Sequence, residues 1–182
     1  MARPDENVGA AFFRPIYMSS VNKNLSEFEG SKIPNASPYT FAIVWSEWNH
    51  EITNALKEGA LQFLIKHGAK KENIIVKSVP GSYELTLGAQ YCMESSEVDA
   101  VITLGCVIQG ETRHFDFICD AVANGITQLN IDYSIPVIFG VLTTQTLQQA
   151  IDRSGGKHGN KGEEAAATAI KMLALRDSFD KM

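Results

Sequence analysis

The sequence predicts an α/β fold: a three-layer α/β/α sandwich in which helices cover both faces of a four-stranded parallel sheet. From Tyr39 onward, short runs rich in β-branched and aromatic residues alternate with longer segments in which apolar residues recur at helical spacing. The run at 98–107 is almost wholly apolar at its centre, as expected for a strand that is covered on both faces. Strands separated by helices are joined by right-handed crossovers, which makes the sheet parallel.

Each element is marked by its own pattern. The four expected strands are short apolar runs, at 39–46, 73–79, 98–107 and 136–142. The expected helices have apolar residues at every third or fourth position, over 52–64, 83–93, 115–129, 147–153 and 160–175. Gly68 ends the first helix, and Pro80-Gly81 ends the second strand. Four such strands form a small flavodoxin-like sandwich, for which we expect the strand order 2-1-3-4.

The composition fits one globular domain. The chain has 182 residues, of which 45% are hydrophobic and 20% are charged, enough to bury a substantial core. We expect the domain at 39–182. Residues 1–38 contain four of the six prolines, with scattered Ser, Asn and Gly, which predicts an extended or mobile arm.

Charge and cysteine content disfavour several classes of protein. The net charge is -5 and no basic cluster is present, so the sequence does not predict a nucleic-acid-binding surface. No apolar run approaches the roughly 20 residues that span a bilayer, and we expect neither a membrane segment nor a signal peptide. Three cysteines without CxxC spacing indicate reduced thiols in a cytoplasmic protein rather than disulfides or a zinc site.

Polar and aromatic residues follow the expected strands. The carboxyl ends of parallel strands meet at one edge of a sheet, where ligands bind in such folds. Trp48 and Tyr83 follow the first two strands and are expected to converge there, with Phe139 on a neighbouring strand. Flat rings in this arrangement offer a slot for a planar heterocycle. The alternative is that all three are ordinary core aromatics.

Two segments have the character of anion sites. Gly110-Glu111-Thr112 stands where a loop enters a helix, and free N–H groups and the helix dipole favour anions there. The alternative is a plain N-cap. His114 follows, and a histidine can move protons near neutral pH, although a single histidine is commonly a surface residue. The segment 153–162, with three cations and four glycines, predicts either a phosphate clamp or a mobile turn between helices.

Taken together, these segments resemble the lumazine synthases. The matching strings stand in the order and spacing of that family, namely VPGSYEL at 79–85, GCVIQGETRHFDFI at 105–118, PVIFGVLTT at 136–144 and QAIDRSGGKHGNKGEEAA at 149–166. The resemblance runs from about residue 40 to the C-terminus. It implies that 39–182 is a single catalytic domain, and that the protein is an enzyme.

The resemblance also implies a reaction. The expected substrates are 5-amino-6-(D-ribitylamino)uracil and 3,4-dihydroxy-2-butanone 4-phosphate. In the family the amine forms a Schiff base with the ketone, phosphate leaves, and ring closure with loss of water gives 6,7-dimethyl-8-ribityllumazine. No metal or other cofactor is implied. Holding two reactants side by side accounts for much of the expected rate.

Residue roles are carried over from the family position by position. The residues implied to bind the pyrimidine and its ribityl chain are Trp48, Ser82, Tyr83, Glu84, Cys106, Val107, Ile108 and Phe139. Those implied to bind phosphate are Glu111, Thr112 and Arg153, with Lys161 as a further candidate. His114 matches the proposed proton donor. Three positions depart from the family pattern, where Glu47 and Gln109 replace common arginines and Cys106 replaces a common Thr.

The family further implies an assembly. Its members form pentamers with active sites shared between neighbouring subunits, and in some of them twelve pentamers build an icosahedral shell. The compact GGKHGNKG segment resembles the shell-forming members, so we expect a 60-mer, with the arm lying along a neighbour's sheet edge. Riboflavin synthase, which consumes the product, is an expected partner.

Three other functions are considered. A relative that dismutates lumazine to riboflavin is distinguished by the product formed from lumazine alone. A flavin-binding shell protein with lost chemistry is disfavoured by Glu84, His114 and Arg153. A signalling receiver would need acidic residues after the first and third strands, where this chain has Trp48-Asn49 and Gly105-Cys106.

Overall fold

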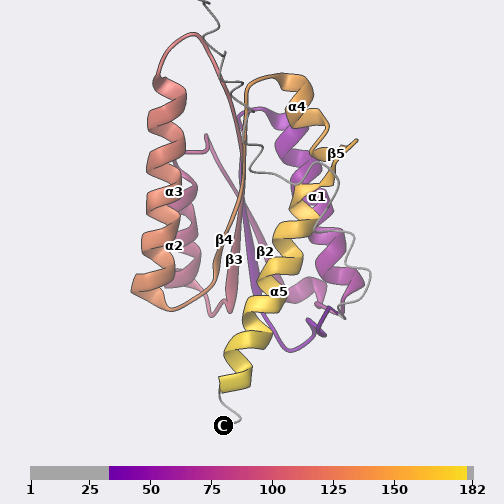
Figure 1. Ribbon diagram of the computed structural model, residues 1–182. Coiled ribbons are helices and arrows are strands. Elements are labelled where there is room, and N and C mark those ends of the chain that lie inside the picture. The colour runs from indigo at the N-terminus through magenta and orange to yellow at the C-terminus, as the bar shows by residue number, and fades with distance from the viewer. Residues whose placement is uncertain (1–32, 180–182) are drawn as a thin grey trace, which may run out of the picture.

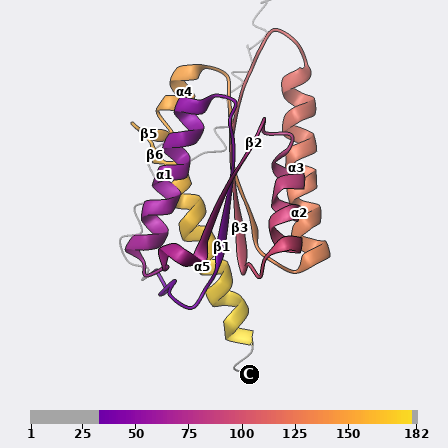
Figure 2. The ribbon, with the colours of Figure 1, turned by 180° about the vertical axis from the view of Figure 1, so that it is seen from behind.

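The computed structural model describes residues 33–179 as a parallel sheet of order β2-β1-β3-β4 between two layers of helices (Figure 1). The strands of this sheet are β1 (Phe41–Ser46), β2 (Ile74–Val79), β3 (Ala100–Ile108) and β4 (Val137–Thr144). Viewed from either side, one face is covered by α2 (Leu85–Ser95) and α3 (His114–Tyr133), and the other by α1 (His50–Lys66) and α5 (Lys161–Phe179) (Figure 2). The predicted three-layer sandwich and its strand order are confirmed.

Period-two alternation along β1 explains why the sheet is buried on both faces. Phe41 and Ile43 point into the core under α1 and α5, and Ala42 and Val44 point into the core under α2 and α3. All four side chains are fully buried. Successive residues of a strand face opposite layers, so an almost continuous apolar run is what a doubly covered strand requires.

At the carboxyl edge of the sheet, β3 and β4 extend further than β1. β4 continues to Thr144, two residues past the predicted end, because its parallel pairing with β3 extends to Ile108↔Thr144. The β1–β3 pairing stops earlier, at Trp45↔Leu104. The end of β3 therefore projects beyond β1 while it remains paired with β4.

The segment after β4 is more ordered than a mobile turn. It contains the short helix α4 (Leu147–Ile151), then β5 (Ser154–Gly156) and β6 (Gly159–Asn160), which pair as an antiparallel hairpin. The sequence predicted a helix over 147–153 but not this hairpin, and it left a phosphate clamp and a mobile turn as alternatives for 153–162. A turn of 3₁₀ helix, η1 (Lys71–Asn73), precedes β2. Within 33–179, no helix combines the length and apolar character needed to cross a membrane.

The predicted arm falls largely outside the described residues, which begin at Ile33. Its last part packs on the domain: the Ala36 side chain is fully buried, and the Ala36 N–H donates to the carbonyl of His67 at 2.9 Å. Ala36 is therefore packed against the domain, while the division at residue 38 stays a prediction. The prediction for 1–32 stays a prediction.

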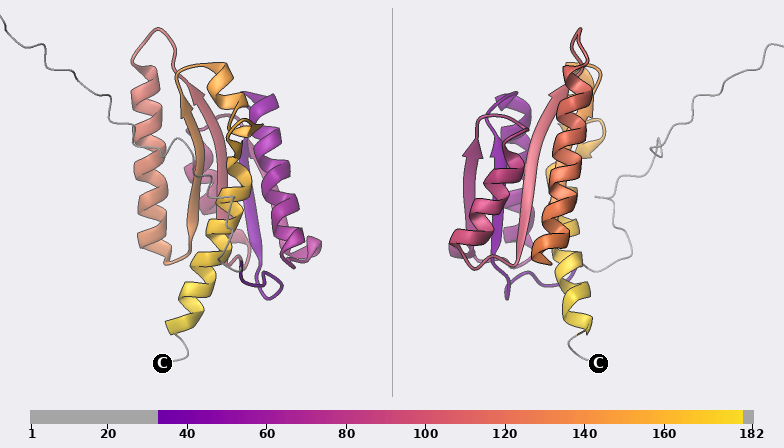
Figure 3. Two further views of the ribbon diagram at one scale, coloured as in Figure 1. Left: turned by 45° about the vertical axis from the view of Figure 1, so that its right-hand side comes forward. Right: turned by 90° about the vertical axis from the view of Figure 1, so that its left-hand side faces the viewer.

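A polar cluster ties α5 to the amino-terminal edge of the sheet, beyond which the helix extends (Figure 3). The buried Tyr39 hydroxyl donates to Asp177 Oδ2 at 2.7 Å, and Arg176 bonds both Asp177 and Asp99 at 3.1 Å. The Thr40 N–H donates to Asp99 Oδ2 at 2.9 Å. Burial and the Asp177 carboxylate raise the pKa of Tyr39 to about 12.

Removing the Tyr39 hydroxyl tests this tie. Tyr39→Phe is expected to lower the free energy of unfolding by about 1–2 kcal/mol, because the hydrogen bond is made to a charged acceptor. The pKa of Tyr39 is higher in the folded state than the ordinary tyrosine value of 10.0. The hydrogen bond's contribution to stability is therefore complete below about pH 10 and is lost as the pH rises towards 12. Urea unfolding of the parent and of Tyr39→Phe from pH 8 to pH 11 measures the difference in their free energies of unfolding. Equal stability at pH 8 contradicts the prediction.

Candidate active site

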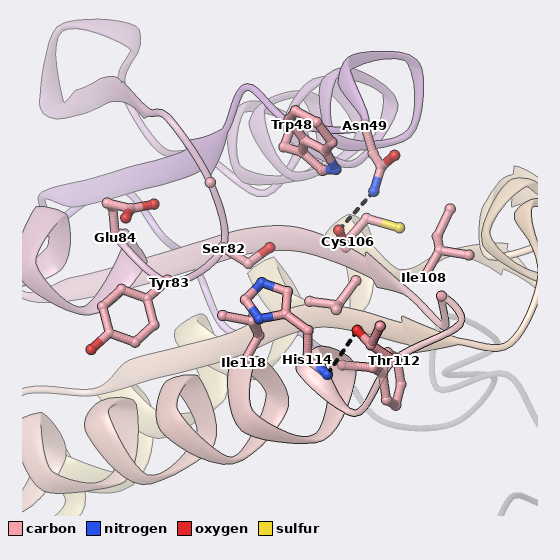
Figure 4. A pocket seen from close by; sticks show the side chains of 14 residues that line it. Trp48, Asn49, Ser82, Tyr83, Glu84, Cys106, Ile108, Thr112, His114 and Ile118 are labelled. Carbon is pink, nitrogen blue, oxygen red and sulfur yellow. Dashed lines mark hydrogen bonds between the residues drawn. The ribbon is translucent and has the colours of Figure 1, made fainter.

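A cavity of about 640 Å³ opens at the carboxyl ends of β1, β2 and β3 (Figure 4). Its lining comes from the end of β3, from the loops that follow these strands and from the first turns of α3. It consists of Trp48, Asn49, Gly81, Ser82, Tyr83, Glu84, Cys106, Val107, Ile108, Gly110, Thr112, His114, Phe115 and Ile118. The sequence predicted nine of the lining residues as site residues. They meet here because the strands are parallel and end at one edge.

The projecting end of β3 forms the floor of this cavity. β1 pairs with β3 only as far as Leu104, so beyond that residue the β1 side of β3 borders the cavity. The Cys106 carbonyl faces this side, since it accepts a hydrogen bond from Asn49 Nδ2 at 2.9 Å. Ile108, two residues further along the strand, directs its main chain to the same side. The main chain of Ile108 is thus available to a flat polar ligand, whereas the Cys106 carbonyl is bonded to Asn49 and the main chain of Val107 faces β4.

Asn49 fixes the junction between β1 and α1, and the sequence analysis did not single it out. Its backbone is left-handed, with φ 58° and ψ 45°, a conformation that Asn tolerates better than most residues. Its carbonyl accepts from the N–H groups of Ile52 and Thr53 at 2.9 and 3.1 Å. Asn49 therefore starts the helix, holds the end of β3, and places Trp48 on the rim, where 72% of that side chain is exposed. An Asn between a strand and a helix is the signal that could have pointed to it.

Two substitutions of Asn49 separate the contribution of its side-chain hydrogen bond from that of its left-handed backbone. Asn49→Ala is expected to destabilise the fold by about 2 kcal/mol, because it removes the bond to Cys106 and because alanine tolerates the left-handed backbone less well than Asn does. Asn49→Gly restores the backbone freedom but not the bond, so a smaller loss is expected. Urea unfolding of the two variants measures both contributions to the free energy of unfolding. If the alanine variant is as stable as the parent, Asn49 does not hold the junction.

Ser82 presents a buried hydroxyl to the cavity. Its side chain is 7% exposed, and within the described residues its Oγ has no hydrogen-bond partner. A β-carbon on Gly105 would lie 2.7 Å from this oxygen, so a glycine is required on the facing strand. A buried hydroxyl without a partner is costly, and its place on the cavity wall suits it to bond a ligand.

His114 and Thr112 line the side of the cavity formed by α3. His114 is the first residue of that helix, and its ring points into the cavity from the side opposite Trp48 (Figure 4). The Thr112 hydroxyl accepts a long hydrogen bond, 3.4 Å, from the His114 N–H. Gly110 leaves open space beside the helix N-terminus, since a β-carbon there would meet nothing within 4 Å. The exposed Glu111 is not part of the lining.

Tyr83 and Glu84 lie at the far side of the cavity from Trp48 (Figure 4). Tyr83 is 59% exposed and precedes α2, which begins at Leu85 rather than at residue 83 as expected. The two rings of Trp48 and Tyr83 are therefore not face to face. Both residues line the cavity, but a slot between their rings is not formed.

A second cavity, of about 380 Å³, lies along the edge strand β4. It contains the remaining candidates Phe139, Arg153 and Lys161. Phe139 is level with Thr103 in the middle of the sheet, five residues before β4 ends, which corresponds to about 16 Å along the strand. The expected convergence of Phe139 with Trp48 is therefore absent within a single chain.

The cations of the second cavity are held by neighbours in their own segments. Arg153 Nη1 donates to the carbonyl of Gln149 at 3.0 Å, and Lys161 Nζ pairs with the buried Glu164 carboxylate at 2.6 Å. Thr144, also in the lining, has a buried hydroxyl without a partner in the described residues. This cavity offers an aromatic face beside positive charge.

The three departures from the family pattern have distinct surroundings. Burial raises the pKa of the Cys106 thiol to about 11, which keeps it protonated at neutral pH and unsuited to nucleophilic attack. The Glu47 carboxylate accepts from the Ser78 hydroxyl of β2 at 2.7 Å and does not line the cavity. The Gln109 N–H donates to the carbonyl of Thr144 at 2.8 Å.

Comparison with known proteins agrees with the motifs. The family model described as 6,7-dimethyl-8-ribityllumazine synthase matches residues 38–177. A protein of that name from Cytophaga hutchinsonii is 63% identical over 157 residues, which cover 86% of this chain and 98% of the relative. Proteins of the same name from Parabacteroides distasonis and Flavobacterium johnsoniae are 56% and 55% identical, covering 86% and 87% of this chain and 98% and 84% of the relatives. The chain belongs to the 6,7-dimethyl-8-ribityllumazine synthase family.

Proposed function

We propose that this enzyme of riboflavin biosynthesis joins 5-amino-6-(D-ribitylamino)uracil to 3,4-dihydroxy-2-butanone 4-phosphate in a site that two neighbouring chains share. The products are 6,7-dimethyl-8-ribityllumazine, phosphate and water. One observation carries the shared site: the candidate residues divide between two cavities, and neither cavity alone holds all the groups that the reaction needs. Because β4 is an edge strand, the cavity along it can lie against a neighbouring chain, which supports this proposal.

The first cavity suits the pyrimidine. The exposed Trp48 ring at the rim offers a stacking surface, and the main chain of Ile108 supplies hydrogen bonds in the plane of a stacked ring. The Ser82 hydroxyl and the Glu84 carboxylate bond the polar edge of the ring and the ribityl hydroxyls. Phe139 of a neighbouring chain closes the pocket from the opposite side.

The phosphate binds where the two chains meet. In the first cavity, Gly110 and Thr112 lie beside the positive end of the α3 dipole. Arg153 of the neighbour adds a forked donor, Lys161 adds a second charge, and the adjacent Glu111 remains a candidate contact. Fixed positive charge stabilises the phosphate as it departs.

His114 moves protons between the two substrates. The amine attacks the ketone, and water leaves as the Schiff base forms. Phosphate is then eliminated to leave an enol, which tautomerises to a ketone. The ribitylamino nitrogen attacks this new carbonyl and closes the ring with loss of water. The His114 ring points into the cavity, close to the helix end at which the phosphate is proposed to bind, and is suited to deliver a proton to a departing oxygen.

We propose that the chain assembles into pentamers and that twelve of these form a 60-mer in the cytoplasm. A ring of identical head-to-tail contacts places one cavity of each kind at every interface. The compact β5–β6 hairpin supports the larger shell, and three free cysteines fit a reducing compartment. Riboflavin synthase is the proposed partner, since it consumes the product. Electron microscopy that shows only small rings contradicts the 60-mer.

Supplying both substrates tests the function. The fluorescent lumazine is expected to form without added metal or cofactor, and omitting either substrate abolishes it. Lumazine supplied alone distinguishes the related dismutation, which yields riboflavin. An enzyme that forms no lumazine from the two substrates, or that forms riboflavin from lumazine, overturns the proposal.

A further inference from the structure

We propose that Asn160 is a positioning residue that holds Arg153 and Lys161 in place by anchoring the β5–β6 hairpin to α1. The inference rests on the proposed function, which assigns these two cations to the phosphate. Arg153 immediately precedes the hairpin and Lys161 immediately follows it. Their main chains are joined, since the Lys161 N–H donates to the Arg153 carbonyl at 2.9 Å. Any shift of the hairpin therefore moves both cations together.

The hairpin is too small to hold its own position. β5 and β6 pair at Ser154↔Asn160 and Gly156↔Gly159, with an irregularity between the two pairs. Two-stranded hairpins of ordinary length are already marginal in water, and this one has no apolar face. Its orientation must come from contacts with the rest of the domain.

The Asn160 side chain supplies these contacts with both ends of its amide. Nδ2 donates to the Ala55 carbonyl of α1 at 2.9 Å and, at 3.4 Å, to the Ser154 carbonyl of β5. Oδ1 accepts from the Gly162 N–H in the first turn of α5 at 2.8 Å. One side chain thus joins α1, the hairpin and α5.

Two glycines make room for this anchor. A β-carbon on Gly59, in the interior of α1, would overlap the Asn160 amide. A β-carbon on Gly162 would overlap the Leu56 carbonyl of the same helix. Glycine is unfavourable inside a helix, so its presence in α1 at the contact with Asn160 indicates that close approach is required. Glycines on both α1 and α5 therefore allow the close packing around Asn160.

Asn160 acts at a distance from the substrates. It belongs to the lining of neither cavity. The side chains of Arg153 and Lys161 are each bonded within their own segments, to Gln149 and Glu164. The hairpin is also bonded to the end of α4, by the His158 N–H to the Asp152 carbonyl at 2.7 Å and by Ser154 Oγ to the Ile151 carbonyl at 3.3 Å. Asn160 adds the side-chain link that fixes its distance from α1. Small displacements of binding groups are costly in reactions that depend on alignment.

Asn160→Asp tests the inference with almost no change of shape. It keeps the acceptor for Gly162 but turns a carboxylate oxygen towards the Ala55 and Ser154 carbonyls. The KM for the sugar phosphate is expected to rise about tenfold, while the KM for the pyrimidine stays within about twofold. Amide hydrogen exchange at Lys161 is expected to quicken. Asn54→Asp, which adds the same charge one residue from Ala55 and leaves the hairpin alone, is the matched control.

A second variant covers the case in which Asn160→Asp fails to fold. Gly59→Ala favours the helix but displaces the Asn160 amide, so the same selective rise in the sugar phosphate KM is expected. Equal rises in both KM values, or no rise in either variant, overturn the inference. Arg153→Ala, measured alongside, separates the causes: if it too leaves the sugar phosphate KM unchanged, the proposed phosphate site itself is wrong.

Discussion

Arg153→Ala is expected to raise the KM for 3,4-dihydroxy-2-butanone 4-phosphate by about 10- to 100-fold, while the KM for the pyrimidine changes by less than about twofold. A hydrogen bond to a charged group contributes about 1.5–3 kcal/mol, which corresponds to this range for the net loss of the guanidinium contact with the phosphate. Among residues 33–179, Arg153 donates to a single carbonyl, that of Gln149, which leaves other N–H groups for a ligand. Steady-state kinetics with each substrate varied in turn measures the effect.

The hairpin provides a matched control for this variant. Lys157 carries the same charge, is exposed, and lines neither cavity. Lys157→Ala is therefore expected to leave both KM values near those of the parent. If Arg153→Ala behaves like Lys157→Ala, Arg153 does not bind the phosphate.

The second large effect is expected at Trp48. Trp48→Ala should weaken binding of the pyrimidine, and of riboflavin as a flat analogue, by about 10- to 100-fold, because stacking of a base on an aromatic ring contributes about 1–3 kcal/mol. The side chain is 72% exposed, so the free energy of unfolding should change by no more than about 0.5 kcal/mol. Fluorescence titration with each ligand measures the affinities.

Trp48→Phe distinguishes stacking from simple loss of bulk. A phenyl ring keeps a flat face at the rim, and most of the affinity is expected to remain. An alanine variant that binds the pyrimidine and riboflavin as tightly as the parent shows that Trp48 does not stack on them.

The sheet was predictable because its signal is local and strong. β1 and β3 are apolar runs with residues buried on both faces, a pattern that few other structures produce. The hairpin at 154–160 was missed because Gly155 and Gly159 are compatible with many conformations, and pairing depends on the contact of Asn160 with α1. Tertiary contacts of this kind leave no periodic trace in the sequence.

The sequence predicted many of the residues that line the first cavity, but not the positions of Phe139 and Asn49 in the fold. Strand-end segments place Ser82, Cys106 and Trp48 around one cavity, as the rule for parallel sheets requires. Phe139 escaped that rule because it lies in the middle of β4, a position that depends on register with β3. Asn49 escaped because its left-handed backbone and its bond to Cys106 are set by the folded junction.

Mixed assembly tests most directly whether two chains complete one site. Trp48→Ala and Arg153→Ala chains, co-expressed with different tags and purified as mixed oligomers, are assayed at substrate concentrations well below the KM of either variant. With random mixing, both halves are intact at about a quarter of the interfaces, so about a quarter of the parent activity is expected, far above that of either variant alone. Activity no higher than the average of the two separate variants would mean that Trp48 and Arg153 serve the same chain or do not serve one site.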